Sequence, residues 1–246
     1  MIPRQRRVNW NEVLHIIHRE THSCCMTKFV TYLEEAVVPY RDGVLDELAA
    51  RVISLCQPMG NSDLVWRGLR VKHPGAFVEL TNDREGFRGK MDPFTAKVIA
   101  KLDLGAPIFC TMSKRQAKFF GSVYAVVPEG DVSFAWNPEI TDLVTAGKSW
   151  ESDVGGKKMR SAASVENDAE NTAKGYKHDK HAPSGWSGEI IMTAKSYIAV
   201  SIPGVHRIAA MSKFCRFSSP DDVKTYRDLA EIVKTYQSYL AWKNKR

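Results

Sequence analysis

The sequence predicts an α+β protein in which helices come first and short strands follow. Apolar residues recur at helical spacing between residues 10 and 57. After the helix-breaking residues 58–61 the apolar runs shorten to strand length, and from about Pro220 a helical period returns. Because helices and strands are segregated and do not alternate, we expect an α+β architecture and not a βαβ one.

We expect the 246 residues to form one domain in three parts. Residues 1–60 supply N-terminal helices, residues 61–217 supply a core of strands, and residues 218–246 supply a C-terminal helix. Three helices are predicted in the first part. Asn11 is a suitable N-cap for the first of them, the second ends near Pro39, and the third covers residues 44–56.

Three histidines and two cysteines lie close together in the N-terminal part. His15, His18 and His22 share one helical face, with Cys24 and Cys25 just beyond it. These residue types bind zinc, and a metal-dependent hydrolase is therefore one alternative for the protein. His22, however, falls a turn beyond the spacing that converges on one ion, so we expect an exposed helix face and no metal.

The middle of the chain alternates short apolar runs with turn residues. Strands are expected at residues 64–71, 107–111, 123–127, 132–136, 189–194 and 197–202, with a further edge strand at 208–211. Helices are expected at 92–104, 114–120 and 140–146, the first with Asp92 as its N-cap and Pro93 in its first turn. Residues 147–187 are polar and are predicted to form a long functional loop. Lys195 and Ser196 suit a tight hairpin turn.

The composition is that of a globular protein with an excess of basic residues. Hydrophobic residues make up 43% and charged residues 26% of the chain, and the net charge is +7. No apolar run is long enough to span a membrane, and no secretory signal is recognisable. Five irregularly spaced cysteines favour reduced thiols in the cytoplasm. Basic clusters at 4–7, 157–160, 174–180 and 243–246 favour nucleic acid or phosphate-bearing partners.

Three short stretches carry residues suited to chemistry on a nucleotide. In the first, at residues 65–68, Arg67 lies between Trp66 and Gly68. Its planar fork suits a phosphate, and Gly68 would let a ligand approach the backbone. The alternative for Arg67 is a solvent-facing position on a strand.

The second and third stretches supply hydroxyls and a carboxylate. Thr111 and Ser113 follow an apolar strand, and their hydroxyls can orient a sugar or cap the next helix. Glu189 lies where a Ser- and Gly-rich loop enters a strand. A carboxylate held there can bind ribose hydroxyls and stabilise an oxocarbenium-like centre, although a solvated charge is the alternative.

In their order and spacing these stretches resemble the Arg-Ser-Glu class of mono-ADP-ribosyltransferases, which includes cholera-like toxins and phage-encoded modifiers of host proteins. The matched pieces are residues 65–68, then 109–113 with Ala117, Phe119 and Phe120, then 188–192, within a region of roughly 64–202. The resemblance implies a split-sheet core that binds NAD in the cleft between two sheets, with N-terminal helices and a C-terminal helix around it.

By that resemblance, NAD is the substrate and no metal is needed. Arg67, with Gly68, would hold the NAD phosphate or the nicotinamide ribose side. Thr111 and Ser113 would stand for the first and last Ser of the family's Ser-Thr-Ser motif. Glu189 would be the catalytic glutamate, bound to the ribose 2′-hydroxyl. The loop at residues 180–187 would recognise the target, with Trp186 as its apolar anchor.

Two positions depart from the family pattern. Met112 replaces the central Thr of the serine motif, which affects packing more than chemistry. Ser187 stands where Arg-modifying members carry Glu or Gln, and a hydroxyl is a poor base for a guanidinium. With the net charge of +7, this departure favours nucleic acid slightly over protein as the acceptor.

The expected function is therefore ADP-ribose transfer by a toxin or phage-conflict effector, for which a neutralising antitoxin is a candidate partner. The alternative is a non-catalytic, basic nucleic-acid-binding protein.

Overall fold

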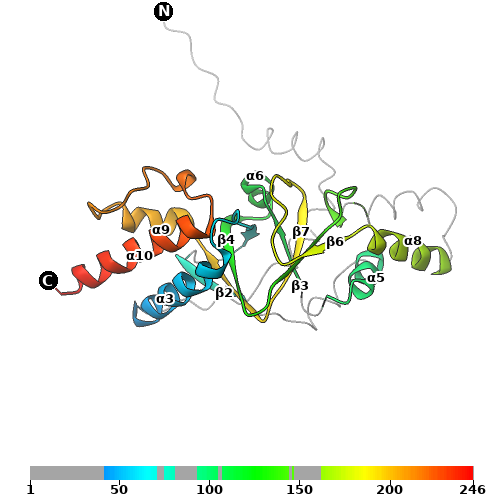
Figure 1. Cartoon of the computed structure of the whole chain (residues 1–246), viewed down its shortest axis with the longest axis horizontal. Helices are drawn as coiled ribbons and strands as arrows, with labels where there is room; N and C mark the ends of the chain where they lie inside the picture. The colour runs from blue at the N-terminus through cyan, green and yellow to red at the C-terminus, as the bar shows by residue number, and fades with distance from the viewer. Residues whose placement is uncertain are drawn as a thin grey trace, which may run out of the picture.

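An antiparallel sheet of eight strands with helices around it makes up the described part of the chain (Figure 1). The computed structural model describes residues 42–70, 75–80, 93–104, 107–143, 146 and 162–245. The strands are β1 Trp66–Leu69, β2 Phe77–Leu80, β3 Pro107–Thr111, β4 Ser122–Glu129, β5 Ser133–Trp136, β6 Lys177–Asp179, β7 Glu189–Thr193 and β8 Ser196–Val200. The α-helices within these residues are α3 Asp42–Met59, α5 Pro93–Lys101, α6 Lys114–Lys118, α8 Ala162–Lys174, α9 Ile202–Ala209 and α10 Tyr226–Lys243. The predicted α+β class is confirmed.

The strand order is β2-β8-β4-β1-β3-β7-β5-β6, and neighbouring strands run antiparallel. Most neighbours pair along their length, as β3 and β7 do from Pro107↔Thr193 to Thr111↔Glu189. The two central strands β1 and β3 instead meet at one pair, Trp66↔Thr111. The sheet is therefore least continuous between β1 and β3.

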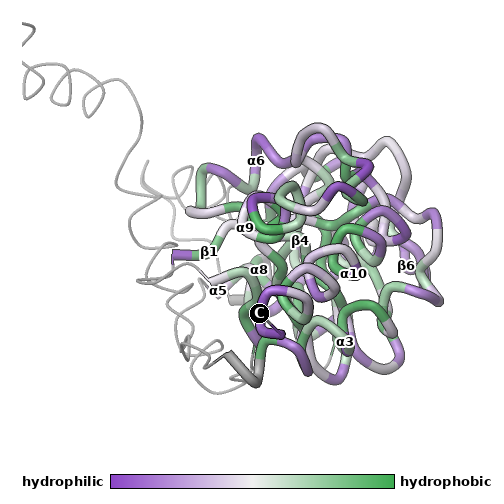
Figure 2. The backbone as a smooth tube through the Cα atoms, turned by 90° about the vertical axis from the view of Figure 1, so that its left-hand side faces the viewer, coloured by the Kyte–Doolittle hydropathy of each residue, from purple (hydrophilic) through white to green (hydrophobic). Residues whose placement is uncertain are grey.

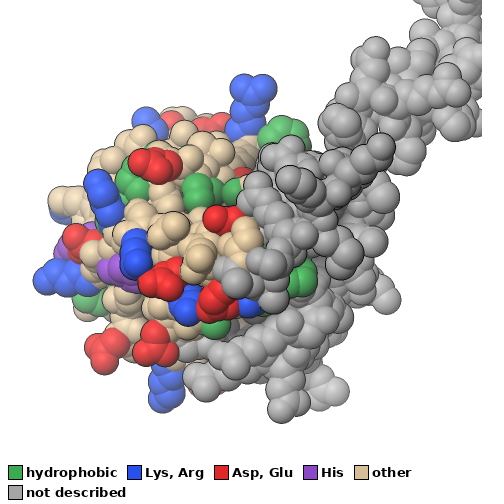
Figure 3. Space-filling view, turned by 90° about the vertical axis from the view of Figure 1, so that its right-hand side faces the viewer, with side chains coloured by type: hydrophobic (Ala, Val, Ile, Leu, Met, Phe, Trp, Pro, Cys, Tyr) green, Lys and Arg blue, Asp and Glu red, His purple; other side chains and the backbone are tan. Residues whose placement is uncertain are grey.

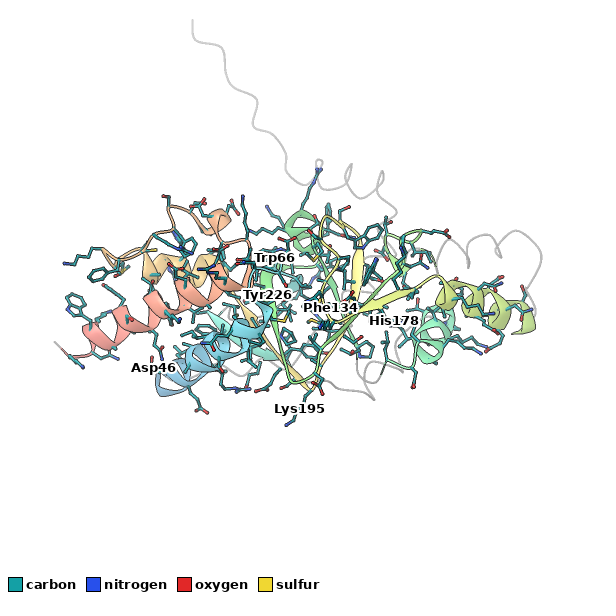
Figure 4. All side chains as sticks on the ribbon, viewed as in Figure 1. Asp46, Trp66, Phe134, His178, Lys195 and Tyr226 are labelled. Atoms are coloured by element: carbon teal, nitrogen blue, oxygen red, sulfur yellow. The ribbon has the colours of Figure 1, made fainter. Side chains whose placement is uncertain are left out.

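Two tight turns carry the chain across this central junction. The turn from β4 to β5 and the turn from β7 to β8 both connect strands on opposite sides of it. The turns lie against each other, because Lys195 N donates to Glu129 O at 3.0 Å. Lys195 marks this place at the lower edge of the molecule (Figure 4).

The predicted hairpin at Lys195 and Ser196 is accordingly wrong. The turn is tight, but β7 pairs with β3 and β5, whereas β8 pairs with β2 and β4. Strands β7 and β8 are both almost wholly buried. Each forms backbone hydrogen bonds along both of its edges with strands on its own side of the sheet, which stabilises it more than pairing with the other strand across the turn would. The Tyr197 hydroxyl holds the turn, accepting from Ala194 N at 2.7 Å and donating to Met192 O at 3.1 Å.

Helices α3, α9 and α10 cover the half of the sheet that contains β2, β8 and β4 (Figure 1). Gln237 Nε2 on α10 donates to Asp46 O on α3 at 3.2 Å, and the two helices pack side by side. The buried Tyr226 hydroxyl donates to Val126 O on β4 at 2.8 Å. Hydrophobic segments gather where these helices meet the strands, and hydrophilic ones lie outside (Figure 2). This packing forms the larger apolar core.

Helices α5 and α8 cover the other half, which contains β7, β5 and β6. Phe94 and Val98 on α5 and Ala169 on α8 form a second apolar cluster with Ile191 of β7. On the outside, Glu166 binds Lys97 at 2.5 Å and Lys101 at 2.6 Å. Viewed from this end, acidic and basic side chains are interspersed on the described surface (Figure 3).

Helix α8 and strand β6 lie within the residues predicted as a long loop. The prediction rested on the scarcity of apolar side chains, and α8 needs few because Ala169 alone is fully buried on it. Alanine has high helix propensity, and the Glu166 ion pairs add contacts that hydrophobicity does not reveal. Of residues 147–187, the first fifteen, 147–161, lie outside the described part of the chain.

Two other predicted elements differ. Residues 208–211, predicted as an edge strand, contain the end of α9, which Ser201 caps by accepting from Gly204 N. The C-terminal helix begins at Tyr226 and not near Pro220, because Ser219 closes a separate capping box over Pro220–Asp222 and Thr225 caps α10. Of the helix predicted at 140–146, Leu143 and Ala146 are helical, but residues 140–142 are not, because Ile140 forms a β-bridge with Asn137; residues 144–145 are not described.

Several predictions fall outside the described residues. These are the first two N-terminal helices with Asn11, the His15, His18 and His22 face, Cys24, Cys25 and the Asp92 cap. The third N-terminal helix is confirmed as α3. Within the described residues no helix is long and apolar enough to cross a membrane.

Replacing Leu229 by Ala tests whether the α10 interface stabilises the fold. Leu229 is fully buried, so the cavity should lower the free energy of unfolding by about 2–5 kcal/mol. Lys234→Ala on the same helix is the matched control, since Lys234 is exposed and should change stability by less than about 0.5 kcal/mol. Urea unfolding monitored by circular dichroism measures both, and equal effects would contradict the packing.

Candidate active site

Three neighbouring strands bring the predicted site residues to one place. Thr111 on β3 pairs with Trp66 on β1 and, on its other edge, with Glu189 on β7. Arg67 follows Trp66. These residues line one small pocket, about 30 Å³ in volume and partly open to solvent. Its lining residues are Trp66, Arg67, Gly68, Phe109, Cys110, Thr111, Gln116, Ala117, Phe120, Asp142 and Glu189. Trp66 marks its place near the middle of the sheet (Figure 4).

Arg67 is buried, with 5% of its surface exposed. The alternative of a solvent-facing strand arginine is therefore wrong. A guanidinium stays charged when buried, and its planar set of donors fits carboxylate or phosphate oxygens. A positive group in the wall of an open pocket makes the pocket suited to an anionic ligand.

Helix α6 covers β1 at Gly68, which changes the explanation for this glycine. A Cβ built on Gly68 would come within 2.0 Å of Ala117 O and 2.8 Å of the Phe120 Cβ. The close approach of α6 is thus sufficient to require a glycine here, and Gly68 also lines the pocket. This contact delivers Gln116, Ala117 and Phe120 to the pocket wall.

Thr111 links three segments through one hydroxyl. Its Oγ1 donates to Gln116 Oε1 at 2.7 Å, accepts from Ser113 N at 3.1 Å, and lies 3.4 Å from Ser187 O. Thr111 therefore connects β3 to α6 and to the loop before β7.

Ser113 acts as the N-cap of α6. Its Oγ accepts from Gln116 N at 3.3 Å, and the residue does not line the pocket. Of the two outcomes that the sequence left open for Ser113, the structure shows helix capping.

Glu189 is held in place at the start of β7. Its backbone N donates to Thr141 O at 2.8 Å, and its Oε1 accepts from Leu143 N at 3.2 Å. The side chain is half-buried in the pocket wall, so the alternative of a solvated surface charge is wrong. The carboxylate is fixed by backbone groups and not by a salt bridge with a described lysine or arginine.

The surroundings of Glu189 favour its neutral form. Burial raises the pKa of Glu189 well above its usual value, the Asp142 carboxylate raises it further, and the Leu143 N–H opposes the shift. Burial, then Glu189 and Asp142, also raise the pKa of the nearby Tyr176 hydroxyl. Strongly shifted carboxyl groups in clefts are common at functional sites.

The two residues predicted to bind a target occupy different environments. Trp186 folds back over its own chain: its Nε1 donates to Glu189 O at 3.2 Å, and its ring fills the space beside Gly188. The ring is thus already in contact with the protein. Ser187 is exposed next to the pocket, where an incoming molecule can reach it.

Asp142, Gln116 and Tyr176 were not identified from the sequence. Asp142 stands in a segment that reads as an ordinary helix, and Tyr176 stands in the polar stretch predicted as a loop. Gln116 is one polar residue of a short helix. Only the spatial approach of these segments to β7 gives the three residues a place at the site.

Comparison with known proteins assigns no function to this pocket. No protein-family model, no curated protein and no solved structure matches this chain. The chemistry of the site is therefore argued from its own residues.

Replacing Glu189 by Gln tests the environment of this carboxyl. Because its pKa is raised above the usual 4.5, the folded protein binds this proton more tightly than the unfolded chain does. Its stabilising contribution is complete below about pH 4.5 and is lost as pH rises through the raised pKa. Glu189→Gln should therefore melt at a higher temperature than the wild type near pH 7.5, with the difference shrinking towards pH 4.5.

The control for this measurement is Glu139→Gln, since Glu139 is exposed. Melting curves recorded across this pH range should show no pH-dependent difference for the control. A Glu189→Gln deficit that is the same at both ends of the range would contradict a raised pKa.

Proposed function

We propose that this protein is an NAD-dependent mono-ADP-ribosyltransferase. The observation that carries the proposal is the convergence of Arg67, Thr111 and Glu189, from three adjacent strands, on one pocket. These are the positions that the resemblance assigns to NAD binding and catalysis. They are more than 40 residues apart in the chain, so a chance pattern of short motifs gives no reason for them to meet.

The lining of the pocket suits the proposed substrate in its charge and its aromatic side chains. The buried Arg67 guanidinium supplies a cation for a phosphate of NAD. Trp66, Phe109 and Phe120 give the pocket aromatic walls suited to a flat ring such as nicotinamide. The pKa of Glu189 is raised, so this carboxyl would have to be in its ionised form to bind a ribose hydroxyl and stabilise positive charge on the ribose as the glycosidic bond breaks. Thr111 would position the loop that leads to Glu189.

The sheet supports the proposal at the level of the fold. The junction between β1 and β3 is one residue pair wide, although the larger apolar core runs beneath both sides of it and includes Ile108 of β3 and Met192 of β7. Such an arrangement would correspond to the split sheet expected from the resemblance, with NAD bound at the junction.

The segment that leads towards Glu189 favours an acceptor that carries phosphate. Lys177 and Lys180 are exposed on β6 and the loop that follows it, with Asp179 exposed between them. Together with the net charge of +7, these lysines would attract the backbone of a nucleic acid. We therefore propose nucleic acid, slightly ahead of protein, as the acceptor.

NAD turnover is the direct test of the proposed chemistry. Purified wild-type protein should release nicotinamide from labelled NAD, and Glu189→Ala should lower the rate by about 100-fold or more, because an electrostatic stabiliser is removed. Arg67→Met should weaken NAD binding by roughly 10- to 100-fold through loss of a charged hydrogen bond. The exposed Glu139→Gln variant should keep the wild-type rate. Wild-type rates in Glu189→Ala would contradict the assignment.

Digestion of the labelled product identifies the acceptor. After incubation of the protein with labelled NAD and a cell lysate, separate treatment with nuclease and protease shows which macromolecule holds the label. Release by nuclease alone is expected. Release by protease alone would assign a protein acceptor, and salt-sensitive binding of nucleic acid without NAD consumption would favour the non-catalytic alternative.

A further inference from the structure

Asp142 lies beside Glu189, and the backbone on either side of Asp142 fixes this position. Thr141 O accepts from Glu189 N, and Leu143 N donates to Glu189 Oε1, at 2.8 and 3.2 Å. Asp142 is the residue between these two contacts, and it lines the same pocket as Glu189. The pocket therefore presents two carboxyl groups from segments about 47 residues apart in the chain.

The segment that carries Asp142 is itself anchored in the protein. Asn137, at its start, is buried; its Nδ2 donates to Thr172 O at 3.3 Å and its Oδ1 accepts from Glu139 N at 2.9 Å. Ile140 N donates to Asn137 O at 3.1 Å, and Leu143 at the end is fully buried. Support of this kind, on both sides of a side chain, is what holds a catalytic group in a defined place.

The two carboxyl groups are carried by different kinds of structure. Glu189 begins strand β7 and its Oε1 accepts a backbone N–H, whereas Asp142 stands on the connecting segment that precedes Leu143. Pairs of carboxyl groups in unlike environments commonly divide two roles between them. In glycosyl transfer one carboxyl stabilises the sugar and the other removes or supplies a proton.

We propose that Asp142 is the general base that takes the proton from the acceptor, while Glu189 stabilises the ribose. The inference rests on the proposed ADP-ribosyltransferase function. The bond between ribose C1′ and the nicotinamide nitrogen breaks, and its electron pair leaves with nicotinamide, which becomes neutral. A lone pair of the acceptor forms the new bond to C1′, and the acceptor's proton passes to the Asp142 carboxylate and then to solvent.

This role narrows the chemistry of the acceptor. A base is needed only where the attacking atom carries a proton, as a hydroxyl or an amine does. A phosphate oxygen is already ionised at neutral pH and needs none. The site is thus suited to a sugar hydroxyl or a base amine of a nucleic acid and not to its phosphates.

The test compares two reactions of the full-length protein. Nicotinamide release from NAD alone measures hydrolysis, and label retained on macromolecules of a cell lysate measures transfer. Asp142→Asn should lower transfer by about 100-fold, the lower end of what a general base contributes, and should lower hydrolysis as well, because the attacking water also loses a proton. Thermal melting checks that Asp142→Asn is folded. Formate added to Asp142→Ala should restore part of the transfer, because it replaces the missing carboxylate, and should restore none to Glu189→Ala.

Each outcome decides the proposal. Lowered transfer with rescue by formate supports Asp142 as the base. Unchanged transfer, or absence of rescue, overturns that role while leaving the proposed function intact, provided that the wild type consumes NAD and Glu189→Ala does not. A wild-type protein that releases no nicotinamide overturns the proposed function and this role together.

Discussion

The pairing of β3 with its two neighbours is the constraint on which the candidate site depends. Thr111 lies opposite Trp66 on one edge and opposite Glu189 on the other. A shift of either pairing by one residue would turn the side chains of that strand to the other face of the sheet and would take Arg67 or Glu189 out of the pocket. The register is secured by the Thr111 hydroxyl, which reaches both the helix after β3 and the loop before β7.

Contacts outside the strands hold β1 in place beside β3. Helix α6 rests directly on β1, because Gly68 leaves no side chain between them. The turn at Gly121 also lies against β1, since a Cβ on Gly121 would come within 2.4 Å of Leu69 O. Lys114, at the start of α6, lies 4.6 Å above the Trp66 ring and binds Asp221 at 2.9 Å. The larger apolar core contains residues from both sides of the narrow join, among them Val126 of β4 and Met192 of β7, and so helps to hold the two sides together.

Much of the fold could be predicted from local sequence, and the failures have physical causes. Strands β1, β3, β4, β5, β7 and β8 and helices α3, α5, α6 and α10 follow apolar periodicity and capping residues, which act locally. Helix α8 could not be predicted that way, because its stability comes from alanines and from ion pairs to α5. The β7–β8 turn has hairpin chemistry, yet partner choice is decided by burial of whole strands.

Some residues of the candidate site could be predicted from the sequence and others could not. Arg67, Thr111 and Glu189 could be predicted because each differs from the apolar residues beside it. Arg67 is a cation within a strand, Thr111 is the last residue of a strand, and Glu189 is the first residue of a strand. Asp142 and Tyr176 have no such local signal. They become candidates only because the folded chain brings them close to Glu189 on β7. Ser113, Gly68 and Trp186 were noticed for good reason, but the protein uses them for capping, close packing and an internal contact.

The turn from β7 to β8 has a consequence for folding during synthesis, because it carries the chain back to the side of the sheet that contains β2 and β4. A chain made only as far as β7 already contains Arg67, Thr111, Asp142 and Glu189, but it lacks β8, which lies between β2 and β4. It also lacks α10, whose Tyr226 hydroxyl binds β4 and whose apolar face covers that side. The part of the sheet that supports β1 is therefore completed last, so a nascent or truncated polypeptide holds every residue of the candidate site before β4 has its second partner strand.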